Sequence, residues 1–304
     1  MFYNQLVTVQ ALCDLNLFST DALGGVQIHS RHSMPLNTNG KDTGYSVISN
    51  LAIRIGDTIW EVVAEGPKIF KNGVEFDLLE EEPIIVHADS DKKDRDDAAA
   101  PLSYSVERVT KGQRKNRVEF IFTFADHSKV IFRGNKHYKM NFIEVHGFSR
   151  HSVVGFLGRT KEKGFFDRQG KDMLSKESSL RNDKSRFSIE AYAQEWQVGV
   201  DEPKLFMNNS EYPVAPEKCS FLGKGSIEGL VGNDIVDPGN NSMNHDEYAA
   251  LPRRKLTGVD DATAEMAREA CAHLSDSNPK KKFCIEDVMA TEEAELAYDS
   301  FYEE

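Results

Sequence analysis

The feature that most constrains the fold is a succession of short apolar runs that extends from the first residues to about residue 150. GVQIHSRHSM, DTIWEVVA, RVEFIFTF and KVIFRG are examples, and runs rich in β-branched and aromatic residues are typical of strands. The residues between the runs include Gly24-Gly25, Asn39-Gly40, Gly56-Asp57, Asn72-Gly73 and Asp126-His127. Because Gly and Asn accept the left-handed backbone of tight turns, the pattern predicts antiparallel hairpins.

Residues 117–124 indicate which side chains form the core, because large residues at even positions alternate with Glu119, Ile121 and Thr123. A period of two places the large residues on one face of a sheet. With 304 residues, the chain is long enough to bury a sizeable core. We therefore expect a mainly β fold, an antiparallel β-sandwich over about residues 5 to 207. Its core is expected to include Leu51, Ile53, Ile55, Trp60, Phe120, Phe122, Phe124, Phe132 and Trp196.

The pattern of strands is interrupted by a charged segment and then ends. Residues 80–101, EEEPIIVHADSDKKDRDDAAAP, lack periodicity and are interpreted as a solvated loop. Residues 208–254 are rich in Gly, Asn, Ser and Pro, which is typical of a linker. The expected organisation is a β-sandwich over 1–207, an irregular linker over 208–254 and a helical module over 255–304.

Helical spacing characterises the last part of the chain. Asp260 and Asp261 can cap a run in which Ala264, Ala267, Cys271 and Leu274 recur at helical spacing, and Asn278-Pro279 ends this run. A second run over 284–302 mixes apolar residues with acids. We expect the two runs to form an α-hairpin.

Charge and hydropathy exclude several classes of partner. The net charge is −12, from 37 basic and 49 acidic residues, and it would repel both nucleic acid and an anionic bilayer. No apolar stretch is long enough to form a membrane-spanning helix. The first residues carry neither Lys nor Arg and read as an alternating strand, so the signal peptide of a secreted form would lie outside this sequence.

Catalytic motifs were sought in the sequence, and none was found: it contains no GxSxG, HExxH, GxxxxGK[ST] or GxGxxG-helix pattern. His29 and His32, three apart in a strand, point to opposite faces and are interpreted as surface residues rather than a metal pair. His146 and His151 can approach one another, but the sequence places no carboxylate beside them. We expect no enzymatic activity.

The alternative is a carbohydrate-active or other hydrolase on a β-sandwich. Glu190, Glu195 and Asp201, near Trp196, are the only plausible carboxylate set for it. A glycosidase needs two carboxyl groups about 5 to 9.5 Å apart in a cleft.

Five segments follow one another in a recognisable order within residues 5 to 207: GVQIHSRHSM, SNLAIRIGDTIWEVV, KNGVEFDL, VVGFLGRT and AYAQEWQVGVDEPKLF. This order resembles that of the von Willebrand factor type D domain. The tail, with AREACAHL and KKFCIEDVMAT, is similar to the cysteine-containing helical segment that follows such domains. The resemblance implies a secreted or cell-surface protein that serves cell adhesion or the extracellular matrix through protein partners or self-assembly.

The chain departs from this family at the calcium site. No Gly-Asp-Pro-His segment opens it, and the turn Val154–Thr160 lacks the cysteines and the Asn of the family. Arg159 and Lys161 occupy ligand positions and would repel a cation, which leaves Asp167 and Asp172 as residual calcium candidates. We expect no bound cofactor.

Four cysteines and two sequons are the candidate covalent features. Cys271 and Cys284 lie on the two arms of the predicted α-hairpin and are expected to form a disulfide in the compartment that the resemblance implies, the alternative being two buried thiols. The missing turn cysteines leave Cys13 either unpaired or paired with Cys219. Asn208 and Asn240 begin N-x-Ser sequons and are candidate glycosylation sites.

Overall fold

The computed structural model describes most of the first 207 residues and parts of the remainder. The described residues are 6–8, 11–34, 46–63, 68–80, 82–87, 103–111, 117–135, 140–159, 165–173, 189–207, 219–221, 226–228, 261–275, 281, 284, 285, 288, 289, 294 and 297.

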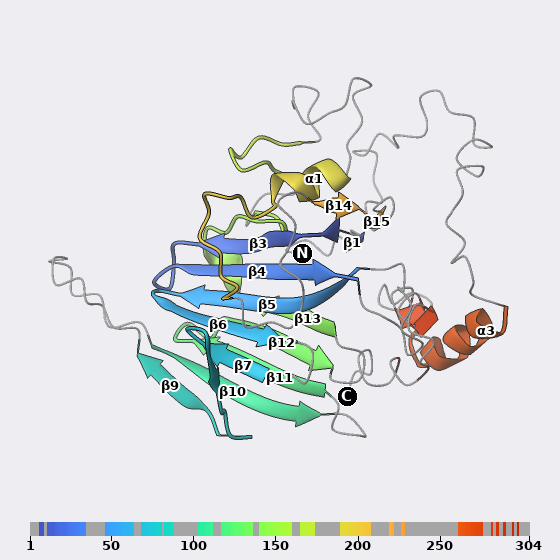
Figure 1. The fold of residues 1–304 in the computed structure, drawn as a ribbon, viewed down its shortest axis with the longest axis horizontal. Helices are drawn as coiled ribbons and strands as arrows, with labels where there is room; N and C mark the ends of the chain where they lie inside the picture. Colours follow the sequence, from blue (N-terminus) through green and yellow to red (C-terminus); the bar gives the residue numbers. More distant parts are fainter. Residues whose placement is uncertain are drawn as a thin grey trace, which may run out of the picture.

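An 11-stranded antiparallel sheet dominates the molecule (Figure 1). Its strands are β3 (Asp14–Thr20), β4 (Val26–Ser33), β5 (Val47–Ile55), β6 (Thr58–Val63), β7 (Lys68–Lys71), β8 (Val74–Phe76), β9 (Ile84–His87), β10 (Ser103–Lys111), β11 (Arg117–Phe124), β12 (Lys129–Asn135) and β13 (Met140–His146). The expectation of a mainly β, antiparallel fold is confirmed.

The sheet divides at β5. Its residues from Asn50 to Ile55 pair with β6, whereas Ile48 pairs with Asn141 of β13. One layer therefore runs from β3 to β8, and the other from β13 to β9. The two layers face each other, since the indole of Trp60 in β6 donates a hydrogen bond to Tyr104 Oη in β10 at 2.9 Å.

The core lies between the layers and contains every residue predicted for it, from Leu51 to Trp196, each at most 3% exposed. Aromatic rings meet edge to face across it: Phe148 contacts both Phe18 and Phe124, and Phe122 contacts Phe132. Such contacts add to the free energy gained by burying the rings.

Glycine and asparagine set the turns as the sequence indicates. Asn72 and Gly73 both have positive φ, 48° and 79°, between β7 and β8. Gly155 has φ 152°, and a Cβ there would meet the backbone carbonyl of Leu17 in β3. The turn around Gly155 therefore lies directly against β3, and Ser19 exchanges backbone hydrogen bonds with Val154 there.

Two expectations from the sequence need correction. Residues 84–87, placed in the solvated loop, form β9 and pair with β10. The run Ile-Ile-Val-His is a good strand former, and the charges on both sides concealed it. The expected linker contains β14 (Ser220–Phe221) and β15 (Ser226–Glu228), which pair with β2 (Ala11–Leu12) and β1 (Leu6–Thr8).

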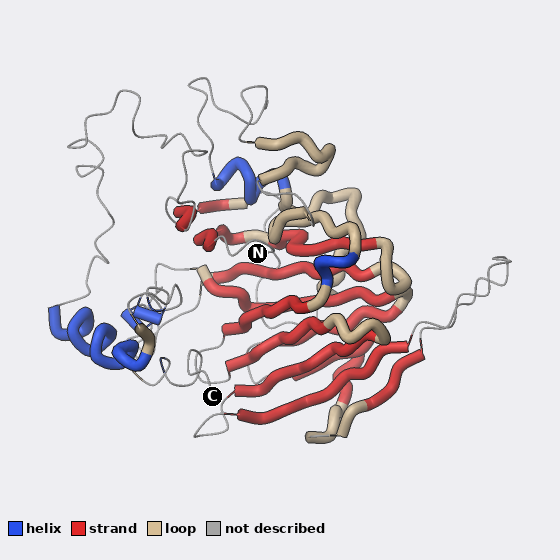
Figure 2. Tube along the Cα trace, turned by 180° about the vertical axis from the view of Figure 1, so that it is seen from behind, coloured by secondary structure: helices blue, strands red, loops and turns tan. Residues whose placement is uncertain are grey.

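The two longer helices lie outside the sheet, one beside its β3 edge and one beyond the ends of its strands (Figure 1 and Figure 2). Helix α1 (Ile189–Glu195) precedes Trp196, and η1 (Phe148–Arg150) follows β13. Helix α3 (Asp261–Ala270) continues into η2 (Cys271–His273). Among the described residues, no helix has the length and apolar character needed to cross a membrane.

The C-terminal helical residues form a second, smaller core. Ala267, Cys271, Leu274, Cys284 and Val288 are buried together, and Cys284 and Val288 of the second arm are helical. Val47 of β5 and Phe142 of β13 pack against this cluster. The helical module therefore contacts the sheet near the point where it divides.

Candidate functional site

The outer face of the layer formed by β3 to β6 is polar, and yet it is buried. Along β4 the core residues alternate with Gln27, His29 and Arg31, and this register places Arg31 beside Asp14 and Asn50 in the neighbouring strands. We call this set of residues the polar face: Asp14, Asn16, Gln27, His29, Arg31, Asn50 and Glu61, each at most 9% exposed. Buried polar groups need partners, so the partners show what this face does.

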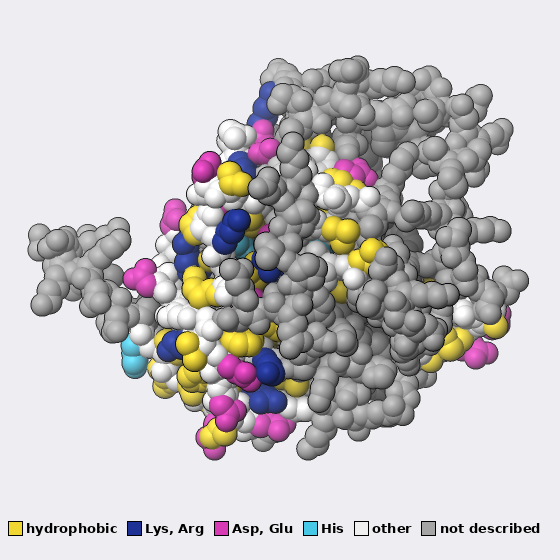
Figure 3. Space-filling view, in the orientation of Figure 1, with side chains coloured by type: hydrophobic (Ala, Val, Ile, Leu, Met, Phe, Trp, Pro, Cys, Tyr) yellow, Lys and Arg dark blue, Asp and Glu magenta, His cyan; other side chains and the backbone are white. Residues whose placement is uncertain are grey.

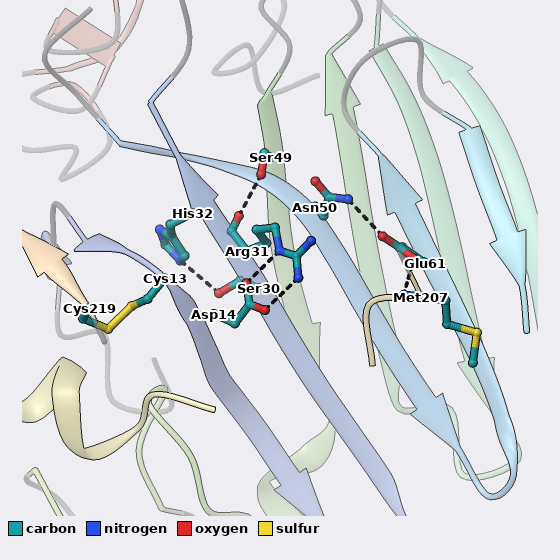
Figure 4. Close-up of polar contacts among 10 residues, drawn as sticks. All are labelled: Cys13, Asp14, Ser30, Arg31, His32, Ser49, Asn50, Glu61, Met207 and Cys219. Atoms are coloured by element: carbon teal, nitrogen blue, oxygen red, sulfur yellow. Dashed lines mark hydrogen bonds and ion pairs between the residues drawn. A yellow bond between two sulfur atoms is a disulfide. The ribbon is translucent and has the colours of Figure 1, made fainter. Parts of the chain in front are cut away.

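A short segment that we call the strap, residues 205–207, covers part of the polar face (Figure 4). Leu205 and Phe206 are buried against Ala52 of β5. The guanidinium of Arg31 lies 4.4 Å from the centre of the Phe206 ring. The strap thus supplies an apolar and cation–π cover for charged groups on the sheet.

Asp14 and Arg31 form a bidentate ion pair beneath this cover. Arg31 Nε donates to Asp14 Oδ1 at 2.8 Å, and the second nitrogen donates to Asp14 Oδ2 at 2.9 Å. The two side chains are 11% and 5% exposed. Two parallel hydrogen bonds fix the relative position of β3 and β4 and compensate much of the cost of burying both charges.

Glu61 connects the sheet to the strap. Its Oε1 accepts a hydrogen bond from Asn50 Nδ2 at 2.9 Å, and its Oε2 accepts one from the backbone N–H of Met207 at 3.2 Å. Both carboxylate oxygens are therefore occupied by donors of the protein itself. This arrangement positions the strap and leaves Glu61 no role as an exposed acid or base.

His29 is a buried, neutral imidazole at the centre of the polar face. It is fully buried, and neither ring nitrogen hydrogen-bonds to the described part of the chain. Burial, followed by the nearby charges of Arg54 and Arg168, lowers the pKa of His29 to about 3. The expectation of a surface residue was wrong for His29, because the polar side of β4 is buried.

His32 follows Arg31 in β4, after an irregularity in the pairing of β4 with β5, and is half-buried. Its Nε2 is 2.9 Å from Ser30 Oγ, and burial lowers its pKa to about 4. Among the residues that the structure describes, no group of three or more His, Cys, Asp or Glu side chains could hold a metal ion. The two histidines thus do not form a metal site with described neighbours.

Arg168 organises the region of the acids considered for hydrolysis. It donates to the backbone oxygens of Glu195 and Gln197, both at 2.6 Å, and pairs with Glu202. Glu195 Oε1 accepts a hydrogen bond from the Arg168 N–H at 3.0 Å. The carboxylate of Glu195 therefore anchors residues 165–173, which we call the 168 loop, to the end of α1.

The other two acids of that set are placed differently. Glu190 is partly buried on α1, and Asp201 is exposed in the turn that Glu202 closes. The turn is held by the Glu202 carboxylate, which accepts from the Gly199 N–H at 3.1 Å.

The residual calcium candidates lie in a small hairpin. Asp167 Oδ1 accepts a hydrogen bond from the Lys171 N–H at 2.7 Å, and Asp172 pairs with Phe166 through the backbone. Asp167 is 7% exposed. Its carboxylate thus serves its own turn, as such residues commonly do.

His146 and His151 each have a carboxylate beside them, contrary to the expectation from the sequence. His151 Nε2 is 2.6 Å from Asp126 Oδ2, and His146 Nε2 is 3.3 Å from Glu144 Oε2. Burial opposes ionisation of Asp126, but hydrogen bonds from Ser128 and His151 outweigh it and lower the pKa of Asp126. The β11–β12 turn supplies Asp126, which is remote in sequence from His151.

All four cysteines are paired. Cys271 and Cys284 form the expected disulfide, with Cα atoms 6.0 Å apart. Cys13 pairs with Cys219, with Cα atoms 4.9 Å apart and 206 positions between them in sequence. The sequence left the partner of Cys13 open, and the structure pairs it with Cys219 beside the β2–β14 pair. The candidate glycosylation sites Asn208 and Asn240 lie outside the described residues.

No protein-family model matches the chain, and no curated protein matches it significantly. The class that fold and site define is a disulfide-bonded, mainly antiparallel β protein with a small helical module.

Proposed function

We propose that this chain is a non-catalytic, secreted or cell-surface module that works in adhesion or matrix assembly by binding other proteins. The observation that carries the proposal is the pairing of all four cysteines in two disulfides. Stable disulfides are typical of secreted and cell-surface proteins, because the cytosol keeps thiols reduced.

The use of the polar residues supports a scaffold rather than a reaction centre. Asp14 is bound to Arg31, both oxygens of Glu61 accept protein donors, and Glu195 anchors the 168 loop. A catalytic group needs access to a substrate and a free position for the proton it transfers. Asp14 fixes β3 against β4, Glu61 holds the strap, and Glu195 holds the end of α1.

The likeness to von Willebrand factor type D domains supports the extracellular part of the proposal. The first three segments that carry it lie in strands β4 to β8 of one sheet, and its Trp196 and Leu205-Phe206 elements are buried against that sheet. Membership of that family is a proposal that rests on the order of these segments.

Two measurements on native material test the compartment. Alkylation before and after reduction, followed by mass spectrometry, is expected to find all four cysteines oxidised in protein from the native host. Glycosidase treatment is expected to reduce the mass through glycans at Asn208 or Asn240. Four alkylated thiols in native protein would overturn the extracellular assignment.

A binding measurement tests the role. The oxidised protein is expected to bind the extracellular matrix or the surface of host cells saturably, and not after reduction and unfolding. The Glu195→Gln variant is the control for the hydrolase alternative. A glycan-hydrolysing activity that disappears in this variant would replace the proposal with that alternative.

A further inference from the structure

The sheet has an open edge at β9. Residues from Ile84 to His87 pair on one side with β10. On the other side, no strand of the described part of the chain pairs with β9. The edge at β3 is different, because Leu15 and Ser19 pair there with Gln197 and Val154. An open edge offers unpaired backbone N–H and C=O groups to a further strand.

The segment of chain that leads from β8 into this edge carries exposed hydrophobic residues. Val74 of β8, Leu79 and Ile85 of β9 are 71%, 58% and 69% exposed. They account for most of the large hydrophobic side chains that are exposed in the described residues, the others being Val200 and Met207. We call residues 74–80 and 82–87 the β8–β9 edge. Exposed apolar groups that recur within one segment of an otherwise well-packed protein indicate a contact surface.

The same segment is strongly acidic. Residues 72–87 contain five Asp or Glu and no Lys or Arg. Glu75, Asp77, Glu80 and Glu82 are exposed, so the charge faces solvent. Figure 3 shows hydrophobic and acidic side chains side by side at the lower margin of the molecule, where β9 and its neighbours lie in Figure 1.

We propose that the β8–β9 edge binds an extended segment of a partner protein that carries both basic and apolar residues, and that this segment adds a strand beside β9. Backbone hydrogen bonds to β9 would hold the strand, and an apolar side chain would cover Ile85. Lys or Arg side chains on the segment would complement the exposed acids. A second copy of this edge is a poor occupant, because it would bring the acids of both copies together.

This inference rests on the proposed binding function and specifies its surface and the chemistry of its partner. The probe is a fluorescein-labelled eight-residue peptide of alternating Lys and Val, and its counterpart contains Glu in place of Lys. Fluorescence anisotropy is expected to show binding of the Lys-Val peptide to the full-length oxidised protein. We expect at least about tenfold weaker binding of the Glu-Val peptide, and a loss of affinity as salt is raised.

Variants locate the contact. Ile85→Lys and, independently, Glu82→Lys are expected to weaken binding of the Lys-Val peptide by about tenfold or more, because each adds a positive charge to the edge. Val200→Lys and Asp201→Lys are the matched controls. Val200 is 72% exposed on the turn beside β3, remote from β9, and these variants are expected to leave affinity unchanged. Circular dichroism verifies that each variant is folded.

Equal affinity for the two peptides, or an unchanged affinity in both edge variants, would overturn the inference. Concentration-dependent dimerisation that Ile85→Lys abolishes would also overturn it, since the occupant would then be a second copy. The matrix-binding measurement separates this inference from the proposed function. If wild type and Ile85→Lys bind host matrix equally, the edge is not the surface used but the binding function stands; if neither binds, the function itself fails.

Discussion

The Asp14–Arg31 pair shows how strongly single residues depend on their burial. Both side chains lie beneath the strap, at 11% and 5% exposure, and form two parallel hydrogen bonds. Lys68 and Glu75 form an ion pair through a single contact of 3.3 Å, and their side chains are 53% and 58% exposed. Solvent screens the second pair and not the first.

We expect Asp14→Ala to lower the free energy of unfolding by about 3–5 kcal/mol, because it removes the bidentate carboxylate partner of the buried Arg31 charge. The control Lys68→Ala is expected to cost at most about 1 kcal/mol, since its pair is exposed. Urea denaturation of both variants and of wild type gives the comparison. Similar losses for the two variants would contradict the role of the cover.

His29 makes stability depend on pH. Its pKa is about 3 in the folded protein, below the ordinary value of 6.5 for an unfolded chain. The unfolded state therefore takes up a proton first as pH falls. The contribution of the neutral imidazole is fully present above pH 6.5 and is lost between pH 6.5 and 3, at up to about 1.4 kcal/mol per pH unit.

We predict that His29→Leu flattens the acid limb of the curve of unfolding free energy against pH. The apolar replacement does not titrate and leaves no unpaired polar atom. His146→Gln, at an exposed position, is the control and is expected to leave the limb nearly as steep as in wild type. Denaturation midpoints from pH 7 to 4 provide the measurement. Parallel curves for wild type and His29→Leu would show that His29 is accessible to protons when the protein is folded.

At the scale of elements, the helical module has a small core of its own. It includes Ala267, Cys271, Leu274, Cys284 and Val288, and, among the described hydrophobic residues of the sheet, Val47 and Phe142 pack against it. The Cys271–Cys284 disulfide spans a short stretch of 13 positions inside this cluster. A small core that is crosslinked by a short-range disulfide is expected to unfold separately from the sheet.

We expect the double substitution of Cys271 and Cys284 by Ser to destabilise the helical module by about 3 kcal/mol, the value for a disulfide that closes a loop of this length. Hydrogen exchange is expected to accelerate over residues 261–275 and to remain slow in β5 and β11. Acceleration across the whole sheet would mean that the module and the sheet unfold as one unit.

At the scale of the whole molecule, the Cys13–Cys219 disulfide joins the start of the first module to the segment that follows residue 207. It lies beside the β2–β14 pair and spans 206 positions. The strap, the 168 loop and the end of α1 all lie between these cysteines in sequence. The bond therefore limits the extension of nearly the entire first module when it unfolds.

We expect the double substitution of Cys13 and Cys219 by Ser to lower the global free energy of unfolding by roughly 5 kcal/mol in the chain-entropy description of disulfides. The loss is expected in sheet and strap alike, unlike that of the Cys271–Cys284 variant. Thermal denaturation followed at the near-ultraviolet signals of Trp60 and Trp196 measures it. A midpoint equal to that of wild type would indicate that the β2–β14 pair holds without the bond.

The sequence by itself determined the strands, the turns and the core. Alternation with a period of two predicted which face of β11 is buried, and Asn72-Gly73 specified the turn between β7 and β8, because these signals act between near neighbours. Helical spacing likewise predicted α3, and together with the compartment that the resemblance implies it favoured the Cys271–Cys284 bond over two buried thiols.

Only the tertiary structure decided the polar face. Gln27, His29 and Arg31 alternate with core residues in β4, which from sequence alone is the pattern of a solvated face. The strap comes from residues 205–207, and the partner of Cys13 is 206 positions away. Contacts at such separation depend on how the whole chain folds back on itself, and no local pattern of residues encodes them. For the same reason Asp126 could not be placed beside His151, nor β9 at an open edge, before the strands were arranged in space.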